Sequence, residues 1–160
     1  MPFRVCVLAC VVLCGCRSAP VQPVDPGPVA ASFVQALNAK GLPQMTALAG
    51  TPFRYRNQPW QSASDGSGYV LGPAQDRVAN SSEELQALLR DVSGSVQIED
   101  PSPVQSAPSK ADLLNGVLKG APSAWSEMNL VLFRRGEGDV EHVAIVGVNA
   151  AGKVTGLYVN

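Results

Sequence analysis

The sequence contains little cysteine, and all of it lies near one end. Cys6, Cys10, Cys14 and Cys16 fall within the first sixteen of 160 residues. A disulfide-stabilised secreted domain would distribute its cysteines through the fold, and a cysteine-based zinc site would need further Cys or His ligands downstream. The rest of the chain therefore has neither feature, so a hydrophobic core must stabilise it. Roughly 130 residues are enough to form such a core.

The sequence also lacks an excess of positive charge. It has 12 Lys and Arg against 13 Asp and Glu, a net charge of −1, and the arginines are scattered. A nucleic-acid-binding domain needs a basic stripe, so we expect no nucleic-acid partner. The sequence has no Gly-Lys phosphate loop, no dinucleotide-binding fingerprint and no clustered metal-ligand motif. It therefore predicts neither a cofactor nor a metal.

What the sequence does contain at its start is an apolar run of nine residues, from Val5 to Leu13, after the single basic residue Arg4. This run is too short to span a bilayer, which takes about 20 residues, but it fits the core of a signal peptide. It ends in Leu13-Cys14-Gly15-Cys16, which resembles the lipobox of bacterial lipoproteins. The resemblance implies that residues 1–15 are removed and that the Cys16 thiol receives a diacylglycerol. The alternative is a buried N-terminal strand or helix that happens to contain cysteine.

The residues after Cys16 suggest a tether. Residues 16–27 hold three prolines and no apolar periodicity, which predicts a semi-rigid, extended spacer. Arg17 stands where Asp retains lipoproteins in the inner membrane of enterobacteria-like cells. By this resemblance we expect a cell-envelope protein, anchored by its lipid in the outer membrane and facing the periplasm.

Residues 28–160 carry the patterns of one folded α+β domain, and its helices are marked by apolar spacing and caps. A first helix opens at Pro28 and stops at Gly41, and a short second one runs from Pro43 to Gly50. Ser81 and Glu84 have the spacing of a capping box, so they predict a third helix. Residues 109–112 could cap a fourth, which would run to Gly120.

The predicted strands alternate apolar and polar residues. Residues 51–56 form a first strand, Trp60 begins its return strand, 61–68 are a flexible loop, and 96–98 form a short strand. Three strands at about 129–135, 140–148 and 153–159 form an antiparallel meander. Four-residue turns would place Phe133 opposite His142, and Arg134 opposite Glu141 as a favourable cross-strand pair.

Three passages together resemble the nuclear transport factor 2-like domains: residues 29–37 followed by 48–53, residues 82–85, and the closing strand 152–158. That resemblance covers residues 28–160. It implies a cystatin-like α+β cone, in which helices pack on a curved, mostly antiparallel sheet that ends in the meander. The family includes isomerases and dehydratases, and also binding and dimerising domains, so fold alone does not choose between them.

The candidate site residues are few. His142 is the only histidine, and in an apolar pocket it could act as a general base. The alternative is a sheet histidine without a role. Trp60, Tyr69 and Trp125 lie beside loops, where aromatic residues line a pocket mouth or contact a partner, or else cap the edge of the core.

Three hypotheses of function remain open on the sequence. The leading one is a membrane-anchored domain that binds a small apolar ligand or an envelope protein without catalysis, with a homodimer as a possible assembly. The second is a small pocket enzyme of the isomerase, dehydratase or hydrolase type that uses His142 as its base. The third is a purely structural envelope lipoprotein.

The lipobox yields a direct prediction. A Cys16→Ala chain should receive no lipid and should accumulate as the uncleaved precursor, because the thiol that carries the diacylglycerol is gone. Fatty-acid labelling and the apparent mass on a gel report both effects. Cys14→Ala, which restores a small residue usual at that position, is the control and should be processed. Normal processing and membrane retention of Cys16→Ala would contradict the lipoprotein hypothesis.

Overall fold

The computed structural model describes residues 24–136 and 140–160. The signal peptide, Cys16 and most of the predicted tether therefore lie outside the described residues. The elements in chain order are α1 (Pro26–Asn38), α2 (Leu42–Leu48), β1 (Ala49–Asn57), β2 (Trp60–Ser62), β3 (Tyr69–Leu71), β4 (Gln75–Ala79), α3 (Ser82–Ser95), α4 (Lys110–Asn115), the 3-10 helix η1 (Ser123–Glu127), β5 (Asn129–Gly136), β6 (His142–Val148) and β7 (Val154–Val159).

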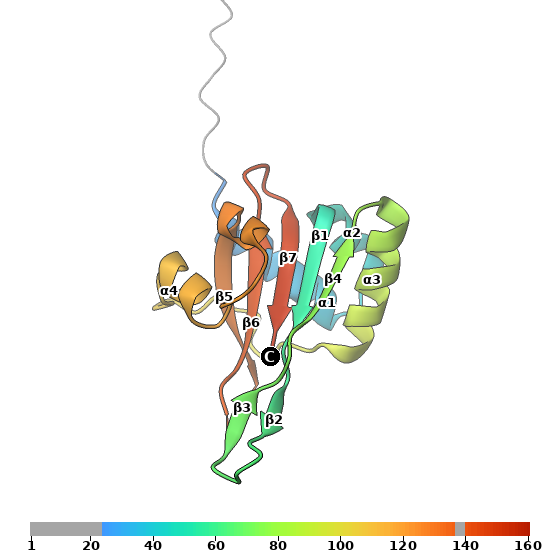
Figure 1. The fold of residues 1–160 in the computed structure, drawn as a ribbon. Helices are drawn as coiled ribbons and strands as arrows, with labels where there is room; N and C mark the ends of the chain where they lie inside the picture. The colour runs from blue at the N-terminus through green and yellow to red at the C-terminus, as the bar shows by residue number, and fades with distance from the viewer. Residues whose placement is uncertain (1–23, 137–139) are drawn as a thin grey trace, which may run out of the picture.

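Five of the strands form one sheet in the order β4-β1-β7-β6-β5 (Figure 1). Neighbouring strands are antiparallel except for the central pair β1 and β7, which is parallel. The predicted α+β class with a mostly antiparallel sheet is thus confirmed. The short strands β2 and β3 pair only with each other and project from one end of this sheet (Figure 1).

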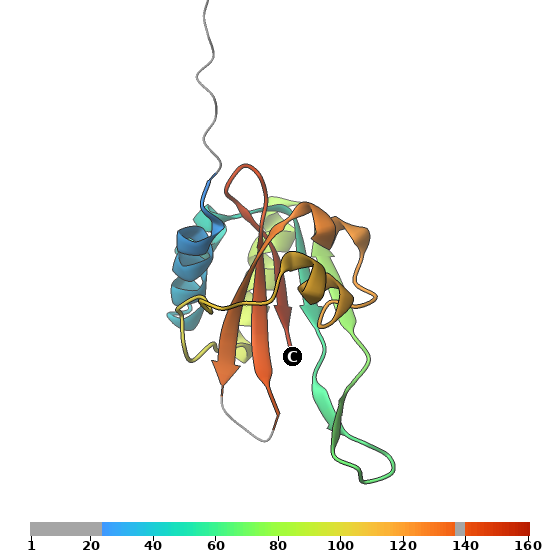
Figure 2. The same cartoon turned by 90° about the vertical axis from the view of Figure 1, so that its left-hand side faces the viewer.

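Both faces of the sheet are covered. Figure 2 shows α1 on one side of the sheet, and α4 with η1 on the other. The larger core cluster lies on the α1 side, where α1, α2 and α3 pack on Phe53, Phe133 and Leu157. The smaller cluster, on the opposite side, joins Trp125 and Leu113 to the strand residues Leu132, Ile145 and Tyr158. Successive strand residues thus alternate between two apolar layers.

The helix termini follow the sequence signals closely. Ser109 and Asp112 form the predicted capping box of α4. At α3, the Ser81 side chain accepts from the Glu84 N–H at 3.2 Å, while the Glu84 carboxylate accepts from the N–H of Asn80 rather than of Ser81. Helix α1 begins at Pro26, two residues before the predicted start, because the Asp25 side chain caps it. Helix α4 ends at Asn115, short of the predicted Gly120.

The predicted strand register is wrong by two residues. Phe133 lies opposite Ala144 instead of His142, and Val159 also lies opposite Ala144. Each pairing contains a register irregularity, and residues 149–153 separate β6 from β7 where four turn residues were expected. Because the shift is even, the residues keep their predicted faces.

The shift removes one predicted interaction. Arg134 lies opposite Val143, so the cross-strand pair of Arg134 with Glu141 does not form. Glu141 instead precedes β6, where its main-chain carbonyl accepts from the Trp60 indole.

Two further strand predictions are wrong. Trp60 does not return along β1; it pairs with Leu71, and the strand that pairs with β1 is β4. The segment containing Val96 and Ile98 forms no strand, although both side chains are buried. The Asn38 amide takes the place of a neighbouring strand, because it donates to the Ile98 carbonyl at 2.6 Å and accepts from the Ile98 N–H at 3.0 Å.

A pair of glycines allows η1 to approach the sheet. Gly147 and Gly156 lie opposite each other in β6 and β7. A Cβ at Gly156 would lie 3.1 Å from the Trp125 ring and 2.9 Å from the Met128 sulfur, and one at Gly147 would lie 2.4 Å from that sulfur. The two missing side chains therefore make room for Trp125 and Met128, which cover this part of the sheet.

This close approach predicts the effect of adding one methyl group. Gly156→Ala should lower the free energy of unfolding by about 1–3 kcal/mol, the usual cost of overpacking a filled core. The matched control is Gly94→Ala in α3, where a Cβ would meet nothing within 4 Å. That substitution should raise stability by about 0.4–1 kcal/mol by restricting the unfolded chain. Urea unfolding of both variants measures the difference, and equal stabilities would contradict the packing described.

Candidate functional site

The most prominent surface feature is the hairpin arm, which we define as residues 60–71. Trp60 pairs with Leu71, and Ser62 pairs with Tyr69. A tight turn closes the arm: the Ala63 N–H donates to the Gly68 carbonyl at 2.8 Å. Asp65 accepts from the Ser67 N–H in this turn at 2.9 Å, and hydrogen bonds from Ser67 lower the pKa of the Asp65 carboxyl. The arm points away from the sheet (Figures 1 and 2).

Three hydrogen bonds fix the base of the hairpin arm. The Gly72 N–H donates to the Pro59 carbonyl at 2.8 Å, and the Gln58 amide donates to the Gly72 carbonyl at 3.1 Å. A Cβ at Gly72 would come within 3.0 Å of the Pro59 carbonyl oxygen, so glycine permits this approach. The Trp60 indole N–H donates to the Glu141 carbonyl at 3.1 Å and ties the arm to the start of β6. The arm is therefore held in place at its base.

Beyond its base, the hairpin arm exposes apolar surface. Tyr69 is 51% exposed and Val70 is 46% exposed, which places both among the most exposed large hydrophobic residues described. An isolated two-stranded hairpin is at best marginally stable in water and gains stability by packing against something else. Aromatic residues presented in this way are typical of protein contacts. The arm thus provides a surface suited to a binding partner.

A polar cluster lies beneath the hairpin arm, on the η1 side of the sheet. The Arg56 side chain is 6% exposed and forms an ion pair with Asp76 at 2.5 Å. Its Nε–H has no hydrogen-bond partner among the described residues. Tyr158 lies opposite Arg56 across the parallel pair, and its hydroxyl contacts the Gln58 amide oxygen at 3.5 Å. Burial raises the pKa of Tyr158 to about 12, against the opposing effect of the Arg56 charge. Its hydroxyl therefore remains protonated at neutral pH.

His142 is half-buried at the start of β6. Its one recorded polar contact is Nδ1 with the main-chain oxygen of Asn160 at 3.4 Å, and Arg135 donates to that same oxygen. None of the pockets described is lined by His142. Among residues 24–136 and 140–160, no hydrogen bond joins His142 directly to another side chain, and the general-base hypothesis gains no geometric support.

The other predicted site residues separate into two groups. Trp60 and Tyr69 both lie on the hairpin arm, at its base and on its second strand. Trp125 is 1% exposed and packs on Gly156, so it covers the core and does not line a pocket mouth. Cys16 lies outside the described residues. Within residues 24–136 and 140–160, no group of three potential metal ligands comes together.

Sequence reasoning missed Arg56 and Asp76 as members of a site. The alternation of residues 51–56 puts Arg56 on the face of β1 opposite Phe53 and Tyr55, and in the structure that face is covered, so the Arg56 side chain is 6% exposed. The signal for its burial was the nearly continuous apolar run of the closing strand that contains Tyr158.

The largest of the pockets described is a surface groove of about 480 Å³ at the opposite end of the molecule from the hairpin arm. Arg54, Glu127, Met128 and the turn residues 149–151 are among its lining residues. Its volume lies within the range of small-ligand sites, but it is an open groove and not an enclosed cavity.

Comparison with models of known protein families and with curated proteins found no match to this chain. No helix in the part of the chain that the structure describes is both long and apolar enough to cross a bilayer.

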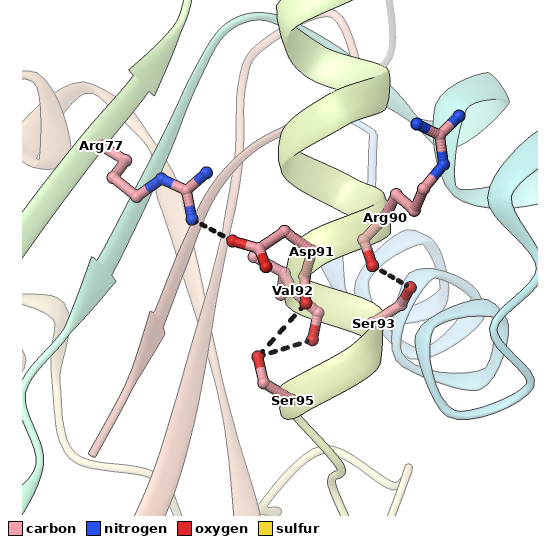
Figure 3. Close-up of polar contacts among 6 residues, drawn as sticks. All are labelled: Arg77, Arg90, Asp91, Val92, Ser93 and Ser95. Atoms are coloured by element: carbon pink, nitrogen blue, oxygen red, sulfur yellow. Dashed lines mark hydrogen bonds and ion pairs between the residues drawn. The ribbon is translucent and has the colours of Figure 1, made fainter.

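The two ion pairs of β4 predict different contributions to stability. Asp76→Ala should lower the free energy of unfolding by about 1–3 kcal/mol, because it leaves the buried Arg56 charge without a partner. Asp91→Ala is the matched control: it breaks the pair of Arg77 with Asp91, whose side chains are 50% and 63% exposed (Figure 3). An exposed pair contributes about 0–1 kcal/mol. Thermal unfolding of the two variants would contradict this account if Asp91→Ala proved the more damaging.

Proposed function

We propose that this protein is a lipid-anchored component of the bacterial cell envelope, and that its domain binds a protein partner through the hairpin arm without catalysing a reaction. The single observation that supports the binding role is the exposure of Tyr69 and Val70 on a projecting hairpin whose base is held in place. The lipobox at Leu13–Cys16 supports the anchor.

The position of Val24, just before the first helix of the domain, supports this arrangement. The Val24 side chain lies beside the turn between β6 and β7, where a Cβ at Gly152 would lie 3.2 Å from it, and this turn is at the opposite end of the domain from the hairpin arm (Figure 1). Val24 follows a lipidated Cys16 by eight residues, which can span at most about 29 Å. A lipid on Cys16 would therefore keep the β6–β7 turn near the bilayer and direct the arm away from it.

The filled core supports a surface-binding role over an interior pocket. On the α1 side, where a cone would enclose a ligand, Phe33, Phe53, Phe133 and Leu157 are fully buried and pack together. The curved, cone-like sheet with a closing meander remains a proposal based on the resemblance to nuclear transport factor 2-like domains.

A small apolar ligand is the second candidate, and the groove of about 480 Å³ beside Met128 favours it. The two candidates occupy opposite ends of the domain, so variants can separate them. The pocket-enzyme alternative, which depends on His142, has no comparable observation in its favour.

The hairpin arm can be tested in cells of the native organism. A photo-crosslinking aromatic residue in place of Tyr69 should give a discrete protein adduct, because this side chain would lie in the interface. The same probe at Gln35, an exposed position on α1, is the matched control and should give none.

The partner recovered at position 69 then allows a quantitative test. Tyr69→Ala should weaken its binding by about tenfold or more, as expected for an interface anchor, and should leave thermal stability unchanged because the side chain is exposed. Equal adducts at positions 35 and 69, or unchanged affinity of Tyr69→Ala, would overturn the proposed role of the arm.

A further inference from the structure

The two edges of the five-stranded sheet differ. The outer edge of β5 is covered by the segment after α3: the Glu99 N–H donates to the Arg135 carbonyl at 3.1 Å, and the Val104 N–H donates to the Leu132 carbonyl at 2.9 Å. The edge strand β4 pairs with β1 and with no other strand in the described part of the chain. Its outward N–H and C=O groups therefore face solvent.

The edge formed by β4 has only part of the usual protection against pairing. Natural edge strands are guarded by short length, charged side chains, prolines, bulges or a covering helix. Strand β4 contains no proline, and its pairing with β1 runs from Ala79 to Gln75 without an irregularity. Both of its charged residues are engaged elsewhere, Asp76 with Arg56 and Arg77 with Asp91.

A small pocket lies beside this edge. It has a volume of about 240 Å³, and the charged residues Arg77 and Glu84 line it together with apolar residues such as Ala87 and Leu88. Arg77 and Ala79 face α3 and this pocket, whereas the 42% exposed Val78 lies opposite Arg54 on the other face of β4. Figure 3 shows β4 beside α3, with Arg77 reaching across to Asp91. An exposed edge strand with a partly apolar pocket beside it provides the elements that recognise an extended peptide.

We propose that β4 binds an extended segment of the protein partner as an additional strand, with one aliphatic side chain of that segment in the pocket between β4 and α3. This rests on the proposed function, since it supposes a protein partner, and it specifies how the partner is recognised. An extended backbone is the ligand whose alternating N–H and C=O groups match those of β4. A second copy fits less well, because antiparallel pairing about Arg77, the midpoint of β4, would place two guanidinium groups opposite each other.

The test uses the full-length protein and a phage-displayed library of random twelve-residue peptides. Peptides selected on it should slow hydrogen exchange at the amides of Gln75–Ala79. Two variants should each weaken binding by about tenfold or more: Val78→Lys, which places a free charge on the edge, and Ala87→Leu, which fills the pocket. Ala87 is exposed on α3, so its substitution leaves the sheet intact. Gln35→Lys, which places the same charge on the exposed face of α1, should leave peptide affinity unchanged and is the matched control.

Three results would overturn the edge-strand proposal: no peptide is selected, the bound peptide protects another region, or the protein self-associates through β4. In each of them the crosslinking at position 69 still tests the proposed function separately. If peptides bind β4 as expected but no adduct forms at position 69, the arm proposal fails and the edge-strand site stands.

Discussion

The fold depends on covering both faces of the two strands β6 and β7. All six residues of β7 are buried, and so are six of the seven residues of β6. Strands of this kind need an apolar layer on each side, because a single layer would leave half of their side chains in water. Helices α1, α2 and α3 supply one layer, and α4 with η1 supplies the other. The close approach of Trp125 and Met128 to Gly147 and Gly156 completes the second layer.

This constraint determines where function can lie. With both faces of the central strands occupied, polar and exposed functional groups gather at the periphery. The Arg56–Asp76 pair lies at one end of the sheet, the hairpin arm projects beyond that end, and β4 forms the open edge (Figure 1). Strands β3 and β4 are nearly continuous in sequence, separated by residues 72–74, so the arm and the edge could engage one partner together.

Much of the secondary structure could be predicted from local sequence signals. The starts of α3 and α4 follow from Ser81 and Ser109, since a cap and its partner lie within four residues of each other. The register of the closing strands could not be predicted by counting, because a bulge adds a residue without leaving a distinct sequence mark. The Asn38 side chain that replaces a strand beside Ile98 is sixty residues away in sequence, beyond any local pattern.

The candidate site was only partly predictable. Trp60 and Tyr69 were chosen as aromatic residues beside loops, and both lie on the hairpin arm. Trp125 also lies beside a loop, but it belongs to the core. The choice of aromatic residues beside loops takes no account of Gly156, against which the Trp125 ring packs. The covering of the second face of the sheet could be predicted from the sequence. The closing strands are apolar at nearly every position, whereas a strand with one solvated face alternates apolar and polar residues.

Amide hydrogen exchange on the full-length protein tests most directly the claim that a doubly buried sheet carries an unpartnered arm. The amides of β6 and β7 should exchange slowest, close to the rate set by global unfolding, and those of the hairpin arm should exchange fast through local opening. Protection of the arm equal to that of β7 in the isolated protein, or fast exchange within β6 and β7, would contradict the account.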